Sequence, residues 1–273
     1  MKYKYLLCAC LWLSYTGPAV AQVFMRAFDN SASMAMGGAS VAYPDADMGI
    51  QNEAIPGFGE KTAVFLSSAI PYGISGWNTA QFQALQRIDA NSGAGIDMNY
   101  SGTDAYREQR YRLLYGRRIG EALYLGGSAD WLRVSAGEYG AASAVSFGLG
   151  LLVRALPDLW LGARIQNPVR QNIGIDAPSS VLRIGASWKP NDRLVLSAET
   201  EKILERPVQI KSGFEYRPIP ALILRAGVKG GGTARLGFGA GVRLKGGLGL
   251  DMGSEWHPSL GMTPSAMIIW RRP

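Results

Sequence analysis

The sequence predicts an all-β fold, a transmembrane antiparallel β-barrel of about 14 strands, with 12 as the alternative, and a small N-terminal plug segment. Three observations predict it: a two-residue alternation along most of the chain, an export signal at the N-terminus, and the lack of a long apolar run after that signal. Strand side chains point alternately to two faces, so each alternating segment has one apolar face and one face of glycine and charge. This combination is typical of a wall between lipid and a polar interior.

The first element, residues 1–21, is predicted to be a cleaved signal peptide. Lys2 and Lys4 precede an apolar run over 5–13, and the small residues Ala19 and Ala21 fit signal-peptidase cleavage. The run is shorter than the roughly 20 residues of a membrane-spanning helix, so cleavage is favoured over a retained anchor. The chain is therefore expected to be exported to a cell outer membrane.

Both cysteines, Cys8 and Cys10, lie in this signal, so the mature chain offers no disulfide, thiolate metal site or cysteine nucleophile. The net charge of the whole chain is +7. Its cations are spaced singly through the alternating segments instead of forming a cluster. This spacing argues against a nucleic-acid partner.

The second element, residues 22–60, is predicted to be a compact plug or cap at one barrel mouth. Residues 34–47 mix small, flexible and turn-forming side chains, and 50–57 are rich in turn residues. Asp45 and Asp47 are expected to shape a turn, because a calcium loop needs more oxygen ligands at regular spacing. No metal and no cofactor is predicted.

The third element, residues 61–273, is predicted to be the barrel. Turn residues such as Gly, Pro, Asn and Asp divide it into strands, and membrane-spanning strands need roughly 9 to 11 residues each. The clearest alternation of apolar residues with glycine and charge occurs in residues 145–154, 181–188, 208–217, 222–229, 235–244 and 248–257.

Charged side chains share the face of the alternation that is predicted to line the lumen. We expect them to form a salt-bridge lattice that closes the lumen, with a conductive channel as the alternative, because isolated buried ions are costly. The charges are Arg154, Arg164, Arg183, Arg225, Arg235, Arg243, Asp97, Glu199, Glu201, Glu215, Asp251 and Glu255. Glycines on the same face are expected to make room for the plug, namely Gly148, Gly150, Gly185, Gly237, Gly239 and Gly241.

Aromatic residues cluster near the predicted strand ends. Such rings suit the interface between membrane and water, although aromatics also favour strands in general. The candidates for this girdle are Trp77, Tyr115, Tyr124, Trp131, Trp160, Trp188, Tyr216, Trp256 and Trp270.

The only histidine, His257, lies between Glu255 and Ser259. Such a trio could serve a lipid hydrolase, but even spacing alone puts all three on one strand face, and Pro258 indicates a strand end. We therefore predict a polar strand terminus and a protein without catalytic activity.

Residues 35–47, which contain Met36, Gly37, Gly38, Asp45 and Asp47, are followed by Gln51-Asn52-Glu53-Ala54. The two stretches together resemble the N-terminal signature of the FadL-like outer-membrane barrels of the PorV/PorQ group. That group usually has an aromatic residue at the position of Gln51 and a proline at the position of Glu53.

The resemblance implies a 14-stranded outer-membrane protein of a Bacteroidetes-type bacterium, with its N-terminal segment near the lumen. It implies a component of type IX protein secretion or of surface-protein attachment, with secretion-system or cargo proteins as partners. The alternative is a FadL-like transporter of small hydrophobic molecules. In either case outer-membrane lipid surrounds the barrel.

Overall fold

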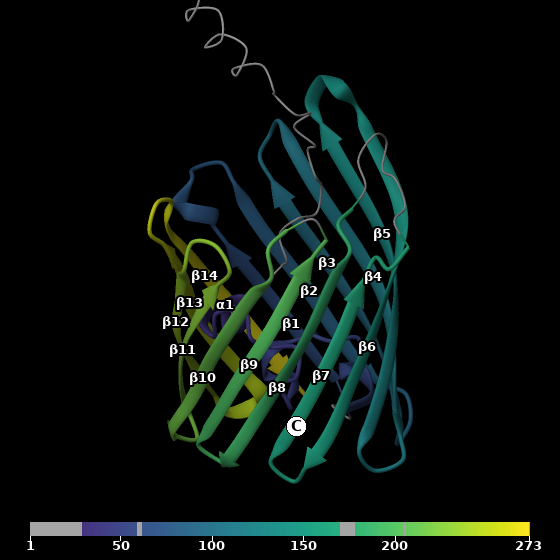
Figure 1. Ribbon diagram of the computed structural model, residues 1–273, viewed down its shortest axis with the longest axis vertical. Helices are drawn as coiled ribbons and strands as arrows, with labels where there is room; N and C mark the ends of the chain where they lie inside the picture. Colours follow the sequence, from purple (N-terminus) through teal and green to yellow (C-terminus); the bar gives the residue numbers. More distant parts are fainter. Residues whose placement is uncertain (1–28, 59–61, 170–177, 205, 273) are drawn as a thin grey trace, which may run out of the picture.

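The computed structural model describes residues 29–58, 62–169, 178–204 and 206–272, and it shows a closed barrel of 14 antiparallel strands (Figure 1). Every strand pairs with its sequence neighbours, and β1 pairs with β14 to close the ring. This confirms the predicted fold class and decides between 14 and 12 strands. The predicted signal peptide lies outside the described residues.

The strands run, in chain order, over residues that alternate between the two faces of the wall. They are β1 (Thr62–Ala69), β2 (Asn78–Arg87), β3 (Ser92–Gly102), β4 (Tyr106–Ile119), β5 (Leu123–Ala136), β6 (Ala141–Leu156), β7 (Leu159–Gln166), β8 (Val181–Asn191), β9 (Leu194–Ile203), β10 (Gln209–Ile219), β11 (Leu222–Gly230), β12 (Arg235–Arg243), β13 (Leu248–His257) and β14 (Gly261–Arg271).

The two ends of the barrel differ in their connections. Tight turns such as 120–122, 157–158 and 220–221 lie where β1 begins and β14 ends, and we call this the turn end. The opposite end, the loop end, carries the connection 70–77 and the tip of the β5–β6 hairpin, which rises above the neighbouring strands (Figure 1). Short 3₁₀ turns sit in three connections: η3 (Pro71–Gly73), η4 (Gly137–Tyr139) and η5 (Lys245–Gly247).

The outer surface of the wall is apolar. Leu113, Leu149 and Met252 are each more than half exposed, and the outward positions of nearly every strand carry similar side chains. A continuous apolar belt is unfavourable in water but favourable in contact with lipid. A closed barrel also leaves no strand edge with unpaired backbone groups. The strands are therefore built to cross a membrane. No helix of the described residues has the length and apolar character needed to cross one.

The predicted aromatic girdle is only partly correct. Tyr115, Trp131, Trp188, Tyr216, Trp256 and Trp270 lie on the outer surface, each 40–47 % exposed. The prediction is wrong for Tyr124 and Trp160, whose positions in the alternation face the lumen, and for Trp77, which lies in the connection 70–77 and also faces the lumen. Tyr124 and Trp160 pack with Phe58, each at a ring-centroid distance of 4.8 Å, and so belong to the interior of the barrel.

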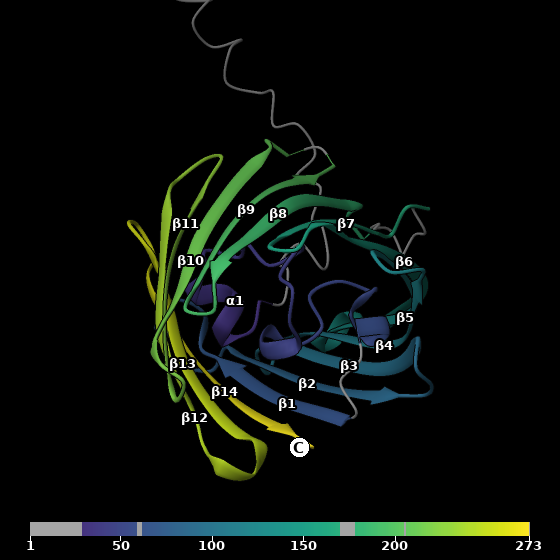
Figure 2. The same cartoon turned by 90° about the horizontal axis from the view of Figure 1, so that it is seen from below.

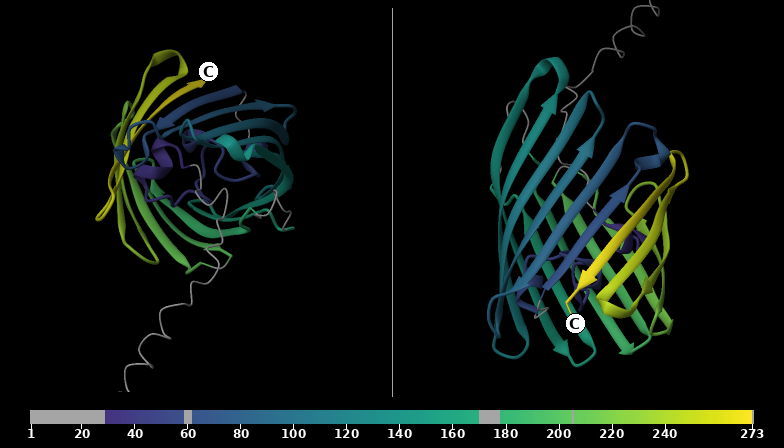
Figure 3. Two further views of the ribbon diagram at one scale, coloured as in Figure 1. Left: turned by 90° about the horizontal axis from the view of Figure 1, so that it is seen from above. Right: turned by 180° about the vertical axis from the view of Figure 1, so that it is seen from behind.

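Residues 29–58, which we call the plug, lie inside the barrel (Figures 2 and 3). The plug contains helix α1 (Ser31–Ala35) and the 3₁₀ turns η1 (Ala46–Met48) and η2 (Ile55–Phe58). Apolar plug residues such as Met36, Met48 and Ile50 form one core cluster with inward residues of the wall, including Phe65 and Leu152. The hydrophobic core of this protein thus lies between plug and wall.

Local sequence explains the shape of the plug. The Asn30 side chain accepts a hydrogen bond from Ser33 N (3.0 Å) and so caps α1 at its N-terminus. Gly37 has a φ of +64°, and a Cβ there would lie 2.7 Å from Val228 N, so only glycine fits this close approach. The Asp45 carboxylate accepts from Asp47 N (2.9 Å), as expected for a turn, whereas the Asp47 carboxylate forms ion pairs with Arg217 and Arg271.

Candidate functional site in the plugged lumen

The first contact between plug and wall is the carboxylate of Glu53, which is fully buried. It pairs with Arg112 of β4 and with Arg164 of β7, the latter at 2.9 Å. Arg112 also pairs with Asp97 (3.3 Å) and Asp130 (3.2 Å) of the wall. One plug carboxylate therefore forms ion pairs with arginines on two separate strands.

The second contact is made by Glu199 of β9. Its carboxylate accepts hydrogen bonds from the backbone N–H groups of Ser40 and Val41, both at 2.9 Å. It also pairs with Arg183 (2.5 Å) and with Lys211 (3.2 Å). A single wall carboxylate thus satisfies plug backbone donors and wall cations together, which offsets the cost of burying it.

The third contact lies at the turn end, around Asp47. This plug carboxylate pairs with Arg217 (2.6 Å) and Arg271, and Arg243 lies 3.6 Å away. The network continues in the wall, where Arg243 pairs with Asp251 (3.0 Å). Beside it, Arg225 joins Glu215 (2.7 Å) to Asp251 (2.5 Å).

These three networks, which we call the three clamps, each fasten the plug to the wall. The predicted lumen charges that take part in these and neighbouring ion pairs are Arg164, Arg183, Arg225, Arg235, Arg243, Asp97, Glu199, Glu201, Glu215, Asp251 and Glu255. Arg154 is an exception to the prediction. It is exposed, and its guanidinium donates to the carbonyl of Pro157 (3.0 Å), because it lies near the end of β6, next to the turn 157–158.

Sequence reasoning missed several members of the network. Lys211, Arg217 and Lys229 occupy inward positions of the alternation, so that signal could have found them. Glu53 has no such signal, because the plug has no two-residue period, and its partner Arg112 is 59 residues away.

The remaining motif residues hold the plug through backbone contacts. The Asn52 side-chain N–H₂ donates to the carbonyls of Val41 (2.9 Å), Leu151 (3.1 Å) and Ala163 (3.1 Å), the last two on β6 and β7. Met36 is fully buried, while Gly37 and Gly38 turn the chain after α1 with positive φ values.

Glycines of the wall leave space for the plug. A Cβ at Gly150 would lie 2.7 Å from Glu53 N, and one at Gly237 would lie 2.8 Å from Ala35 O. Gly148, Gly185 and Gly239 likewise face plug atoms. Gly241 differs from the prediction, since a Cβ there would meet Asp251 and Arg243 of the wall.

A cavity of about 610 Å³ remains in the loop-end half of the lumen, next to the plug residues Asp29 and Met34. Aromatic side chains line one side, with Tyr72 and Trp77 from the β1–β2 connection and Tyr106 from β4. The Trp77 indole N–H donates to Ser101 Oγ (3.2 Å), which fixes the ring in the cavity wall.

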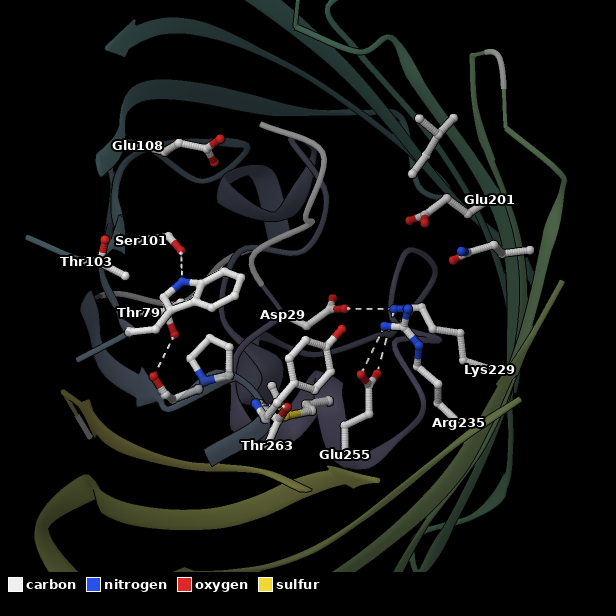
Figure 4. Close-up of a pocket in the computed structure, with 18 of the residues that line it drawn as sticks. Asp29, Thr79, Ser101, Thr103, Glu108, Glu201, Lys229, Arg235, Glu255 and Thr263 are labelled. Carbon is white, nitrogen blue, oxygen red and sulfur yellow. Dashed lines mark hydrogen bonds and ion pairs between the residues drawn. The ribbon is translucent and has the colours of Figure 1, made fainter. Parts of the chain in front are cut away.

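Charged side chains line the other side of this cavity (Figure 4). Lys229 lies 3.6 Å from Asp29 and 3.9 Å from Glu255, and Arg235 pairs with Glu255 at 3.2 Å. These charges pair with one another, and on the aromatic side the carboxylate of Glu108 accepts a hydrogen bond from the Tyr106 hydroxyl.

The carboxyl of Asp29 anchors the first described residue of the plug. Burial disfavours its charged form, but Lys229, Lys211 and Arg183 outweigh this effect, and a hydrogen bond from Ser33 adds to theirs. Together they lower the pKa of Asp29 from 3.8 to about 2. The ion pair with Lys229 therefore persists in mildly acidic media.

We expect Asp29→Asn to lower the free energy of unfolding by roughly 2 kcal/mol near neutral pH, the value that corresponds to this pKa shift. Because the folded pKa is depressed, the stabilisation is complete above the unfolded pKa of about 3.9 and is lost as the pH falls toward 2. Denaturant unfolding of the unchanged chain and of the Asp29→Asn variant in lipid vesicles measures this difference in stability. The difference between them should stay constant from about pH 8 to 5, and a difference that vanished in that range would contradict the assignment.

The predicted trio around His257 does not form a catalytic arrangement. His257 Nδ1 accepts hydrogen bonds from the backbone N–H groups of Ser259 (3.1 Å) and Leu260 (3.2 Å), so it cannot donate to an acidic partner as in a catalytic triad, and the proton of the neutral ring lies on Nε2. Glu255 pairs instead with Arg235. Within the described residues no group of three acidic, histidine or cysteine side chains could hold a metal ion.

No model of a known protein family matches the sequence, and no curated protein matches it. Solved structures do share the fold. The toluene transporter TodX of Pseudomonas putida aligns with a TM-score of 0.66 and 14% identity, over 91% of this chain and 98% of that one. A FadL homologue of Pseudomonas aeruginosa aligns with a TM-score of 0.67 and 12% identity, over 88% and 96%. CymD, a monoaromatic hydrocarbon channel, gives 0.67 and 13%, over 89% and 97%.

Identities this low show the fold alone. They support the FadL-like barrel architecture that the N-terminal residues indicate. The narrower assignment to the PorV/PorQ group and to a Bacteroidetes source stays a prediction.

Proposed function

We propose that this protein is an outer-membrane channel that takes up small hydrophobic molecules, with the loop-end cavity as the site that first receives them. The observation that carries the proposal is the cavity itself, which combines about 610 Å³ with the rings of Tyr72, Trp77 and Tyr106. Its volume lies within the range of small-molecule sites, roughly 300–1,000 Å³. Aromatic rings lining such a site favour flat, apolar ligands.

The names of the structural neighbours suggest the size of the ligand. TodX is a toluene transporter and CymD a monoaromatic hydrocarbon channel. We therefore propose monoaromatic hydrocarbons as the first substrates to test on this chain. The transport is passive and needs no catalytic residue.

Passage beyond the cavity requires movement. The described wall is hydrogen-bonded around the whole ring, and the three clamps hold the plug across the lumen below the cavity. We propose that this arrangement is the closed state, in which the plug keeps ions and water-soluble compounds out. Entry of a ligand would then have to be followed by a shift of plug or wall.

The role in type IX secretion or surface-protein attachment stays a prediction from the resemblance of residues 35–54. Such a role requires a protein-sized docking surface. Several loop-end connections are short, such as 103–105, 231–234 and 258–260. The loop-end cavity, at about 610 Å³, has the size of a small-molecule site and not of a protein-docking surface.

The proposal predicts that Trp77→Ala lowers the affinity for toluene about tenfold, because the stacking surface of one ring is lost. The measurement is the concentration dependence of labelled toluene uptake into cells that express the full chain. Trp131→Ala is the matched control, since Trp131 is a tryptophan on the lipid-facing surface. Uptake equal to that of cells without the protein would refute the function, and equal effects of the two substitutions would refute the site.

A further inference from the structure

An aromatic pair marks the border of the apolar outer surface that lies toward the loop end on β4 and β5. Tyr111 and Trp131 are direct register partners, and their rings stack at a centroid distance of 5.3 Å. Both occupy outward positions of the alternation, and Trp131 is 44 % exposed. Stacked aromatic rings at this height fit the level of the lipid head groups.

Two arginines lie just above this pair, on the same strands and the same outer face. Gln109 is the register partner of Arg133, and Arg107 is the partner of Ser135. Arg133 is two residues beyond Trp131, and Arg107 is four residues beyond Tyr111, in both cases toward the loop end. The two arginines are thus diagonal neighbours, a relation that places residues about 7–8 Å apart.

Both guanidinium groups are exposed. Neither has a hydrogen bond or an ion pair with another residue of the described chain. The acidic residue nearest to Arg107 in sequence, Glu108, points into the barrel, where it lines the cavity and accepts from the Tyr106 hydroxyl. The acidic residue nearest to Arg133, Asp130, is buried and pairs with Arg112. Among the side chains that the structure describes, none neutralises the positive charge of the pair.

This arrangement is not repeated around the ring. On the other described strands, the outward positions at the loop-end border carry no arginine, and the one lysine there, Lys202, already donates to the Arg206 carbonyl. The two arginines and the stacked rings beside them are thus a local feature of the β4–β5 pair, next to the tall β5–β6 hairpin (Figure 3).

We infer that Arg107 and Arg133 bind the phosphate group of a lipid in the leaflet at the loop end, while the acyl chains lie below, against Tyr111 and Trp131. Guanidinium groups bind phosphate oxygens in bidentate fashion, and two of them at this spacing can share one phosphate. The loop end carries the longer connections, which places it outside in an outer membrane. The lipid is then a phosphorylated outer-leaflet lipid of the lipid A type. This orientation rests on the proposed location, but not on transport.

The test is native mass spectrometry of the full chain in neutral detergent with added bis-phosphorylated lipid A. We expect the double variant Arg107→Gln/Arg133→Gln to bind it roughly thirtyfold more weakly than the unchanged chain. The matched control is Arg117→Gln/Arg193→Gln, which removes two exposed arginines at the turn end. All four positions are exposed, and the heat-dependent gel mobility of folded barrels checks that each variant is intact.

Three results would overturn the inference. One is equal binding of lipid A by the double variant and the unchanged chain. Another is equal binding of lipid A from which both phosphates have been removed. The third is complete displacement of the lipid by millimolar inorganic phosphate, which would assign the pair to free phosphate instead. Toluene uptake by the double variant should stay unchanged, so failure of this inference and failure of the proposed function are distinguishable.

Discussion

Replacing Glu53 with glutamine should destabilise the protein by about 3–5 kcal/mol, the usual cost of removing one partner from a buried ion pair. The destabilisation depends on which acidic partners the two arginines retain. Arg112 keeps Asp97 and Asp130, but Glu53 is the carboxylate that the described chain pairs with Arg164. The substitution therefore leaves one buried guanidinium without its counter-ion, although glutamine fills the same volume.

Unfolding by guanidinium chloride in lipid vesicles measures this loss of stability. We also expect the variant to show ion-permeable openings, which planar-bilayer recordings measure. The control is Asp45→Asn, because the ion pair of Asp45 with Arg271 is long, at 3.6 Å, and the Asp45 side chain is 38 % exposed. An exposed pair of this kind contributes less than about 1 kcal/mol. If both variants were equally stable, the plug would not be held by the buried pairs.

The barrel can be predicted from the sequence because each strand carries the pattern of its two faces. In β12, Leu236 and Phe238 face lipid while Gly237 and Gly239 face the plug, and this pattern needs no knowledge of the partners. The same logic predicts inward charges such as Arg183 and Glu199, because only a paired or hydrated ion is stable in the lumen.

The alternation does not show where the wall ends or which side chains meet across the lumen. Tyr124 and Trp160 belong to the core because Phe58 of the plug packs between them, and this contact depends on the fold of a segment without a regular period. Arg154 follows the same inward rhythm but lies at the end of β6, where its guanidinium is exposed and donates to the turn carbonyl of Pro157. The clamp formed by Glu53 is likewise a long-range contact, which no local pattern predicts.

A second large effect is expected when Gly126 of β5 is replaced by valine. A Cβ at this position would overlap the backbone carbonyl of Glu53, and it would also come too close to the Ala54 amide. The backbone here cannot give way as a flexible side chain can, because two buried arginines hold the Glu53 side chain in place. Overpacking of a tight core costs about 1–3 kcal/mol and can exceed this where relaxation is blocked.

The neighbouring residue provides the matched control, since Gly127→Val puts the same side chain on the opposite face of the same strand. The nearest atom to a Cβ there is 3.6 Å away, and the position faces lipid, where valine suits a strand. We therefore expect Gly126→Val to lower the unfolding midpoint and to open the lumen to ions, while Gly127→Val leaves both unchanged. Equal behaviour of the two variants would mean that the plug does not press against the wall at this point, and the closed state proposed for the channel would lose its structural basis.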